Sequence, residues 1–183
     1  MNLANLLTCS RVILAVIFTA FLFSPGPFGK FLALFTFAAA ALTDYWDGVV
    51  ARGTGEVSQF GKLMDPIADK LLTLSAFFSF WRLDLIPLWT VLVVVARDII
   101  VTGARFFMPP ESRSRSARSS GKQKTVLQML YIIAVLLYLI ARQSGDWYPS
   151  WNNPALQMIH AGMLIIVAIT VLSGVRVFIK KNE

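Results

Sequence analysis

Cysteine, charged residues and polar linkers are all scarce in this chain of 183 residues. The single cysteine, Cys9, excludes an intramolecular disulfide and a metal site built from several thiols. Charged residues make up only 15% of the chain, hydrophobic residues make up 56%, and the mean hydropathy is +0.65. This composition excludes an ordinary soluble domain. Because no polar linker divides the sequence, we expect one domain over residues 1–183.

Long apolar runs fill most of the chain. A helix needs roughly 17–25 residues to cross a hydrocarbon core, and lipid offers no partner to unpaired backbone groups, so each such run is expected to be a helix. The first run lacks a convincing cleavage site and is expected to be retained. The pattern predicts an all-α, polytopic integral membrane protein with six transmembrane helices, at about Leu6–Phe23, Phe31–Ala51, Leu63–Trp81, Ile86–Phe107, Thr125–Ala141 and Ala155–Ile179.

The connections between these runs differ in their content of Lys and Arg. The outer connections hold Lys30 and Arg82, with Arg142 at a helix end, whereas most other basic residues fall on the opposite side. Under the positive-inside rule both termini are expected in the cytoplasm, with the chain in the cell inner or plasma membrane. The same rule accounts for the Arg- and Ser-rich run Glu111–Ser120 as a short cytoplasmic loop, so no nucleic-acid partner is expected.

Acidic residues are also few, ten in all, and four of them lie between Asp44 and Asp69 beside long apolar runs. Carboxylates there are costly, so a functional site is the default interpretation. Asp44 and Asp47 are three residues apart, and Asp65 and Asp69 are four apart, so each pair shares one helix face. If the two helices are antiparallel neighbours, the four carboxylates converge and require cations. Oxygen ligands favour Mg²⁺ or Mn²⁺, and two such ions would suit phosphoryl transfer.

Small and basic residues accompany the four aspartates. Gly48 leaves room for a ligand beside Asp47, Gly61 permits close backbone approach, and Arg52 is suited to hold a phosphate. The alternative is that the aspartates only form ion pairs with Arg52 and nearby lysines, but that alternative leaves the small residues unexplained.

The stretch Asp-x2-Asp-Gly-x2-Ala-Arg-x8-Gly-x3-Asp-x3-Asp, residues 44–69, resembles the signature of the CDP-alcohol phosphatidyltransferase family at every fixed position. The resemblance implies six transmembrane helices, a divalent-metal site and transfer of a phosphatidyl group from CDP-diacylglycerol to an alcohol, with release of CMP. It also suggests a homodimer.

The resemblance implies roles for individual residues. Asp69 would be both a metal ligand and the general base that accepts the proton of the attacking hydroxyl. The implied metal ligands are Asp44, Asp47, Asp65 and Asp69, and the implied contacts to CDP-diacylglycerol are Asn5, Thr8, Gly48, Arg52, Ser58 and Gly61.

Three further segments are similar to segments of bacterial phosphatidylglycerophosphate synthases, which are members of this family: Asn5–Arg11, Ala96–Arg105 and Gly121–Gln128. They favour sn-glycerol 3-phosphate as the acceptor. Arg97 and Arg105 are eight residues apart and share a helix face. With Lys122 and Lys124 they are expected to bind the acceptor phosphate. Alternatively, Arg105, Lys122 and Lys124 only contact anionic lipid head groups. Arg97 could likewise form an ion pair with Asp98 or with a signature aspartate.

Two other functions stay open at this point. Asp98 stands where the phosphatidylglycerophosphate synthases commonly have Glu and is more similar to cardiolipin synthases, which use phosphatidylglycerol as acceptor. A membrane cation transporter would also place aspartates inside apolar helices. All four signature aspartates are expected near one membrane face, and no comparable set of acidic residues continues toward the other face, so the transferase is preferred.

Overall fold

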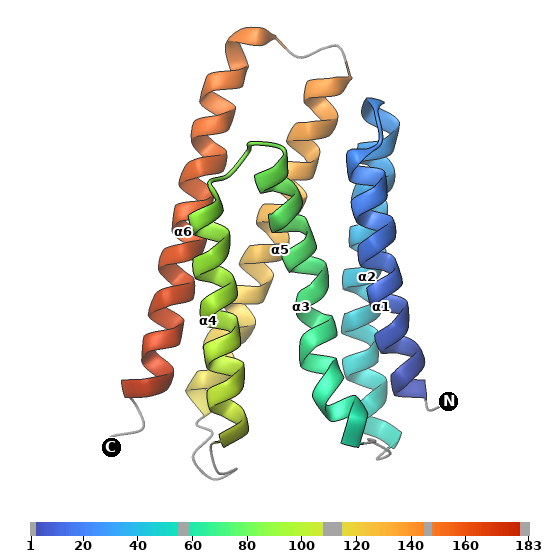
Figure 1. Cartoon of the computed structure of the whole chain (residues 1–183), viewed down its shortest axis with the longest axis vertical. Helices are drawn as coiled ribbons and strands as arrows, with labels where there is room; N and C mark the ends of the chain where they lie inside the picture. The colour runs from blue at the N-terminus through green and yellow to red at the C-terminus, as the bar shows by residue number, and fades with distance from the viewer. Residues whose placement is uncertain (1–2, 55–58, 108–114, 145–147, 180–183) are drawn as a thin grey trace. The chain divides into compact units, whose positions relative to one another are not determined.

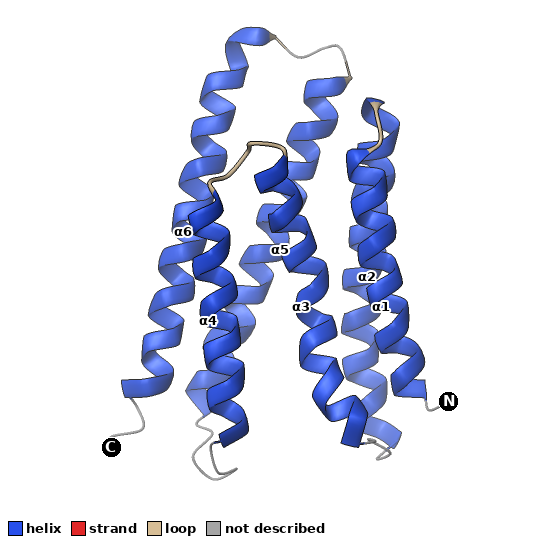
Figure 2. Ribbon diagram, in the orientation of Figure 1, coloured by secondary structure: helices blue, strands red, loops and turns tan. Residues whose placement is uncertain are grey.

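The computed structural model describes residues 3–54, 59–107, 115–144 and 148–179. Within these ranges the chain forms six α-helices and one short 3-10 helix, and no strand (Figures 1 and 2). The helices are α1 (Leu3–Phe23), α2 (Gly26–Thr54), α3 (Gln59–Arg82), α4 (Leu88–Phe107), α5 (Arg115–Gln143) and α6 (Asn152–Ile179), with η2 (Pro149–Trp151) before α6.

These helices confirm the six apolar runs predicted from the sequence, with one difference in the region expected as a loop. The polar run Glu111–Ser120 was expected to be a connection, but α5 already begins at Arg115. This segment contains neither Gly nor Pro before Gly121, and Arg and Ala favour helix, so the apolar helix extends through its charged neighbours.

The chain divides into two compact units. The first contains Met1–Ser79 and Val135–Trp147, and the second contains Phe80–Ala134 and Tyr148–Glu183. Helices α3 and α5 each contribute residues to both units. Each unit is therefore described by itself, and the single domain expected over residues 1–183 stays a prediction.

In the first unit, α1 and α2 form an antiparallel hairpin closed by a tight turn. Phe18 of α1 and Phe37 of α2 are fully buried, and their ring centroids lie 5.7 Å apart. Gly29 is needed at the turn because a Cβ there would lie 2.8 Å from the Cβ of Ser24. Lys30 donates from Nζ to the Ser24 carbonyl just beyond the end of α1. Its positive charge thus sits at the negative end of the α1 dipole.

In the second unit, the end of α3 is closed by a capping turn rather than a glycine. Asp84 has a φ of 55°, its N–H donates to the Trp81 carbonyl at 2.9 Å, and the Leu85 N–H donates to the Phe80 carbonyl at 3.0 Å. These two bonds are those of a Schellman motif, and the accompanying apolar pair is present because Phe80 and Leu85 are both buried.

Helices α5 and α6 of the second unit are joined by a tyrosine. The Tyr131 hydroxyl donates to the Ile159 carbonyl at 3.0 Å. The ring needs the small residue Gly162, because a Cβ there would lie 2.9 Å from ring carbon Cε2. Close approach at a small residue, with one polar bond between helices, is typical of helix packing in lipid.

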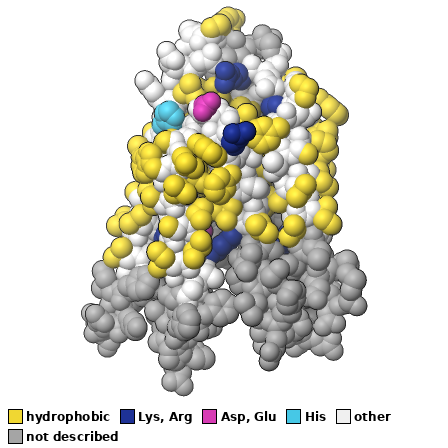
Figure 3. Space-filling view, viewed as in Figure 1, with side chains coloured by type: hydrophobic (Ala, Val, Ile, Leu, Met, Phe, Trp, Pro, Cys, Tyr) yellow, Lys and Arg dark blue, Asp and Glu magenta, His cyan; other side chains and the backbone are white. Residues whose placement is uncertain are grey.

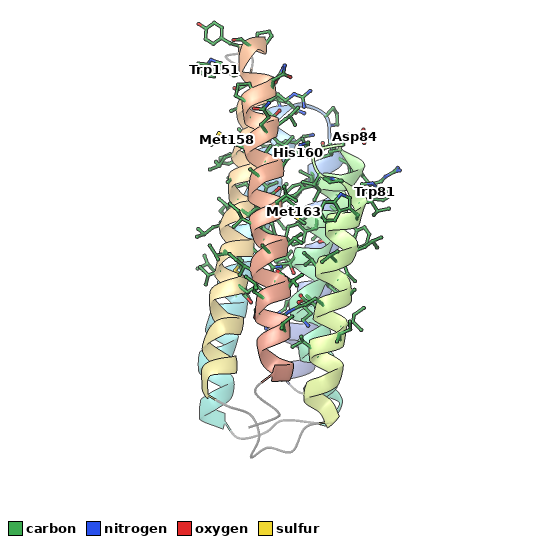
Figure 4. All side chains as sticks on the ribbon, turned by 90° about the vertical axis from the view of Figure 1, so that its left-hand side faces the viewer. Trp81, Asp84, Trp151, Met158, His160 and Met163 are labelled. Carbon is green, nitrogen blue, oxygen red and sulfur yellow. The ribbon has the colours of Figure 1, made fainter. Side chains whose placement is uncertain are left out.

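The outer surface of the described helices is strongly apolar, as a lipid-facing surface would be. Figure 3 shows hydrophobic side chains over most of the described part of this face. Figure 4 shows Met158 pointing away from the neighbouring helices, while Met163 of the same helix is fully buried. Among the described residues, three segments are long and apolar enough to cross a membrane, namely Gly26–Thr43, Lys124–Gln143 and Pro149–Val175, and Ser10–Phe23 is a shorter apolar helix.

Candidate functional site

The four signature aspartates lie on two consecutive helices of the first unit. Asp44 and Asp47 belong to the second half of α2, and Asp65 and Asp69 belong to the first half of α3. Only residues 55–58 separate the helices, so the end of α2 and the start of α3 lie within about 19 Å of each other. Uninterrupted helix at both pairs keeps each pair on one face.

An all-carboxylate donor set of this kind fits Mg²⁺ or Mn²⁺ and not a soft metal. The spacings of three and four residues within continuous helix fit two ligands to a common ion. The side chains of the aspartates lie outside the part of the chain whose side chains are described. So do those of Asn5, Thr8, Gly48, Arg52, Gly61, Arg105 and Lys122, and Ser58 lies outside the described residues altogether.

Two of the four residues expected to bind the acceptor phosphate, Arg97 and Lys124, have described side chains, and these lie together in the second unit. Arg97 of α4 and Lys124 of α5 both donate to the same carboxylate oxygen, Oδ1 of Asp98. The Nη1 of Arg97 lies 3.0 Å from this oxygen. The chain thus brings two predicted cations together around one anion.

Arg97 is also fixed to α6. Its Nε donates to the Thr170 carbonyl at 3.1 Å, and its Nη2 donates to Oγ of Ser173 at 2.8 Å. Gly174 lies against the stem of the same side chain, where a Cβ would be 3.2 Å from Cγ of Arg97. Three helices are therefore linked through the adjacent residues Arg97 and Asp98 of α4, since Arg97 bonds to α6 and Asp98 bonds to Lys124 of α5.

The side chains of this cluster are almost completely buried. The side chains of Arg97, Asp98 and Lys124 are only 13%, 12% and 5% exposed. Charges at such sites persist when they are paired and hydrogen-bonded. The described members of the cluster are two cations and one anion.

The sequence alone identified Arg97, Lys124 and the possible Arg97–Asp98 pair, but it missed the contribution of α6. Thr170, Ser173 and Gly174 stand in an apolar run that shows no motif beyond its hydrophobicity. The only signal was a group of small and hydroxyl-bearing residues, which in membrane helices also arises from ordinary packing.

Comparison of the whole sequence with known proteins gives matches over most of the chain. Residues 1–175 match the sequence profile of the CDP-alcohol phosphatidyltransferase family. The chain is similar to a CDP-diacylglycerol–glycerol-3-phosphate 3-phosphatidyltransferase of Bacillus subtilis, with 34% identity over 75% of this chain and 77% of the relative. A protein of the same name from Rickettsia typhi is 31% identical over 90% of this chain and 92% of the relative. A probable cardiolipin synthase (CMP-forming) of Drosophila melanogaster is 34% identical over 86% of this chain and 51% of the relative.

Proposed function

Because the chain belongs to the CDP-alcohol phosphatidyltransferase family, an integral membrane family, we propose that it transfers the phosphatidyl group of CDP-diacylglycerol to sn-glycerol 3-phosphate and releases CMP. The observation that carries this proposal is the complete signature, with its carboxylate pairs on two consecutive helices. Relatives named for this reaction support the choice of acceptor.

On the donor side, Asp44, Asp47, Asp65 and Asp69 would hold two Mg²⁺ or Mn²⁺ ions, since the family is generally dependent on a divalent metal. Such ions neutralise a diphosphate and make its phosphorus a better electrophile. The residues proposed to bind CDP-diacylglycerol are Asn5, Thr8, Gly48, Arg52, Ser58 and Gly61. The arginine supplies a fork of N–H donors suited to phosphate.

In the transfer step, Asp69 accepts the proton of the acceptor's terminal hydroxyl. The hydroxyl oxygen then bonds to the phosphorus next to the diacylglycerol, and the bond from that phosphorus to the bridging oxygen breaks. CMP departs with the bridging oxygen, and phosphatidylglycerophosphate is formed. The proton remains on the Asp69 carboxylate until it is released.

On the acceptor side, Arg97 and Lys124 are proposed to bind the phosphate of glycerol 3-phosphate, together with Arg105 and Lys122. The guanidinium and ammonium groups are donors suited to phosphate oxygens, and the buried setting strengthens each charged hydrogen bond. Asp98 keeps both described cations in place. Inositol carries no charge and would gain nothing from these cations, and serine offers only a carboxylate beside its own ammonium group.

Phosphatidylglycerol is the second candidate acceptor, with cardiolipin as the product. The observation that favours it is Asp98, which stands where phosphatidylglycerophosphate synthases commonly have Glu and is more similar to cardiolipin synthases. The relative named as a probable cardiolipin synthase adds support. Matches to relatives named for the glycerol 3-phosphate reaction make that acceptor the first choice.

The orientation and assembly of the protein are further parts of the proposal. Both termini and the signature would face the cytoplasm, because the connections on that side carry most Lys and Arg. The soluble acceptor glycerol 3-phosphate and the soluble product CMP would then be exchanged on that side. A homodimer is proposed from the family resemblance.

The test is an acceptor panel with purified protein, Mg²⁺ and CDP-diacylglycerol, followed by CMP release. Glycerol 3-phosphate should give turnover well above phosphatidylglycerol, inositol phosphate and serine, and chelation of the metal should stop it. Preferred use of phosphatidylglycerol would replace the proposal with cardiolipin synthesis. Failure to release CMP with any alcohol, together with cation flux in vesicles, would replace it with transport.

A further inference from the structure

We infer that α6 is part of the acceptor site, because Ser173 and Gly174 position the Arg97 guanidinium for the acceptor phosphate. This inference rests on the proposed function. It assigns a role to a helix in which the sequence showed only hydrophobicity. Neither residue is expected to touch the substrate, so both are positioning residues.

Three of the five N–H donors of Arg97 have acceptors in the described structure, which leaves two that a ligand could use. A guanidinium has five N–H donors. Nε is used by the Thr170 carbonyl, and each terminal nitrogen uses one N–H, for Asp98 and Ser173 respectively. The second N–H on each terminal nitrogen has no acceptor among the residues that the structure describes. Two such donors on one guanidinium match the paired oxygens of a phosphate.

The contacts from α6 restrict how the guanidinium is turned. Arginine has a long flexible stem, and ordering it costs about 2 kcal/mol of rotamer entropy. The carbonyl of Thr170 and the hydroxyl of Ser173 hold two different nitrogens, so they fix both the position and the plane of the group. Preorganisation of this kind lowers the entropy lost when a ligand binds.

Gly174 allows this arrangement because it has no side chain. A Cβ at this position would lie 3.2 Å from Cγ and 3.4 Å from Nε of Arg97. The arginine stem would have to shift by a few tenths of an ångström, and Nε would move relative to the Thr170 carbonyl. Gly174→Ala is therefore a second perturbation of Arg97 that removes no hydrogen-bonding group.

A purely structural role is the competing explanation. Arg97 would then only join α4 to α6, and weakening the link would lower stability without affecting one substrate more than the other. Steady-state kinetics separate the two explanations, because a positioning role changes the KM for the acceptor selectively.

The experiment measures CMP release by wild type, Ser173→Ala, Ser173→Thr and Gly174→Ala, with glycerol 3-phosphate and CDP-diacylglycerol varied in turn. We expect Ser173→Ala and Gly174→Ala to raise the KM for glycerol 3-phosphate by about tenfold, as for loss of one hydrogen bond to a charged group. The KM for CDP-diacylglycerol should change less than twofold, and Ser173→Thr, which keeps the hydroxyl, should stay near wild type.

Two controls and a double mutant complete the design. Gly162→Ala changes a glycine of the same helix that contacts Tyr131, and Ser79→Ala removes a buried hydroxyl bonded within its own helix. Both should leave the ratio of the two KM values unchanged. If Ser173 acts through Arg97, Arg97→Lys combined with Ser173→Ala should be no worse than Arg97→Lys alone.

Equal changes of both KM values, unchanged KM values, or full additivity in the double mutant would overturn the inference while leaving the proposed function standing. If Ser173→Ala does not fold, the same criteria apply to Gly174→Ala and Ser173→Thr. Absence of wild-type turnover with glycerol 3-phosphate would overturn the proposed function first, and this inference with it.

Discussion

At the scale of single residues, the cluster around Asp98 is the most demanding feature of the described structure. Arg97, Asp98 and Lys124 hold three charges within a few ångströms, in a part of the chain surrounded by apolar helices. Removing one member of a buried group of charges leaves the others uncompensated, which commonly costs about 3–5 kcal/mol. This cost makes the aspartate a stabilising partner of both cations and not an independent site.

Asp69 carries the first prediction at this scale. Asp69→Asn keeps the size of the side chain but removes a base and one negative charge, so turnover should fall by at least about a hundredfold. Affinity for CDP-diacylglycerol should be retained in large part, because three other aspartates remain. CMP release and binding of the nucleotide lipid are measured on the same preparation, and unchanged turnover would eliminate Asp69 as the base.

Thr170 carries the second prediction. Its hydroxyl is fully buried and has no partner among the described residues, whereas Thr19, Thr36 and Thr43 each donate to the carbonyl four residues back. Thr170→Val removes a hydroxyl that is costly to bury and keeps the carbonyl that accepts from Arg97. Because an unsatisfied buried group costs about 1–3 kcal/mol, thermal unfolding in detergent should occur at an equal or higher temperature. Ser79→Ala, which loses a satisfied hydroxyl, is the matched comparison. A clear fall in unfolding temperature for Thr170→Val would indicate that its hydroxyl is bonded in the membrane protein.

At the scale of elements, small residues decide how closely the helices approach. Gly29 closes the turn between α1 and α2, Gly162 receives the Tyr131 ring, and Gly174 receives the Arg97 stem. In lipid the hydrophobic effect does not distinguish one helix contact from another, so close fit and a few polar bonds determine which faces meet.

The turn after α3 gives the prediction at this scale. Asp84 adopts a φ of 55° at a position where glycine has no steric penalty. Asp84→Gly should raise the free energy of unfolding by about 1 kcal/mol, whereas Asp84→Val should lower it, because a β-branched residue is poorly tolerated in the left-handed region. Thermal unfolding of the two variants and the wild type measures their stability, which should be highest with Gly at position 84, intermediate with Asp and lowest with Val. Any other order would show that the Asp84 side chain contributes more than its backbone conformation costs.

At the scale of the whole molecule, the distribution of Lys and Arg and the apolar helices together predict one orientation in the membrane. The single cysteine makes this testable, since Cys9→Ser yields a chain without thiols. On that background, Ser120→Cys should react with a membrane-impermeant maleimide only from the cytoplasmic side. Ser150→Cys, in η2, should react only from the opposite side. Labelling of intact cells and inverted vesicles measures both, and the reverse pattern would place the signature outside the cytoplasm.

The sequence by itself determined the six helices, the membrane class and the family, because each follows from local information. Hydrophobic runs set the helices within a few residues, since lipid leaves the backbone no other hydrogen-bonding solution. The signature aspartates stand out in the sequence because carboxylates are costly in an apolar chain, and their spacing places each pair on one helix face. Their role as metal ligands stays a prediction. The start of α5 was missed because helix propensity extends through a charged segment that hydropathy marks as an end.

Only the tertiary structure decided which side chains surround Arg97. Asp98 adjoins Arg97 in the sequence, but Lys124, Thr170, Ser173 and Gly174 lie on other helices and are 27 to 77 residues away along the chain. No local pattern encodes such contacts, because they depend on how helices turn and approach each other, and that is set by packing at small residues. The stretch from Asp44 to Asp69 thus carries the family signature in the sequence itself, whereas packing among α4, α5 and α6 determined how Arg97 and Lys124 are paired and held.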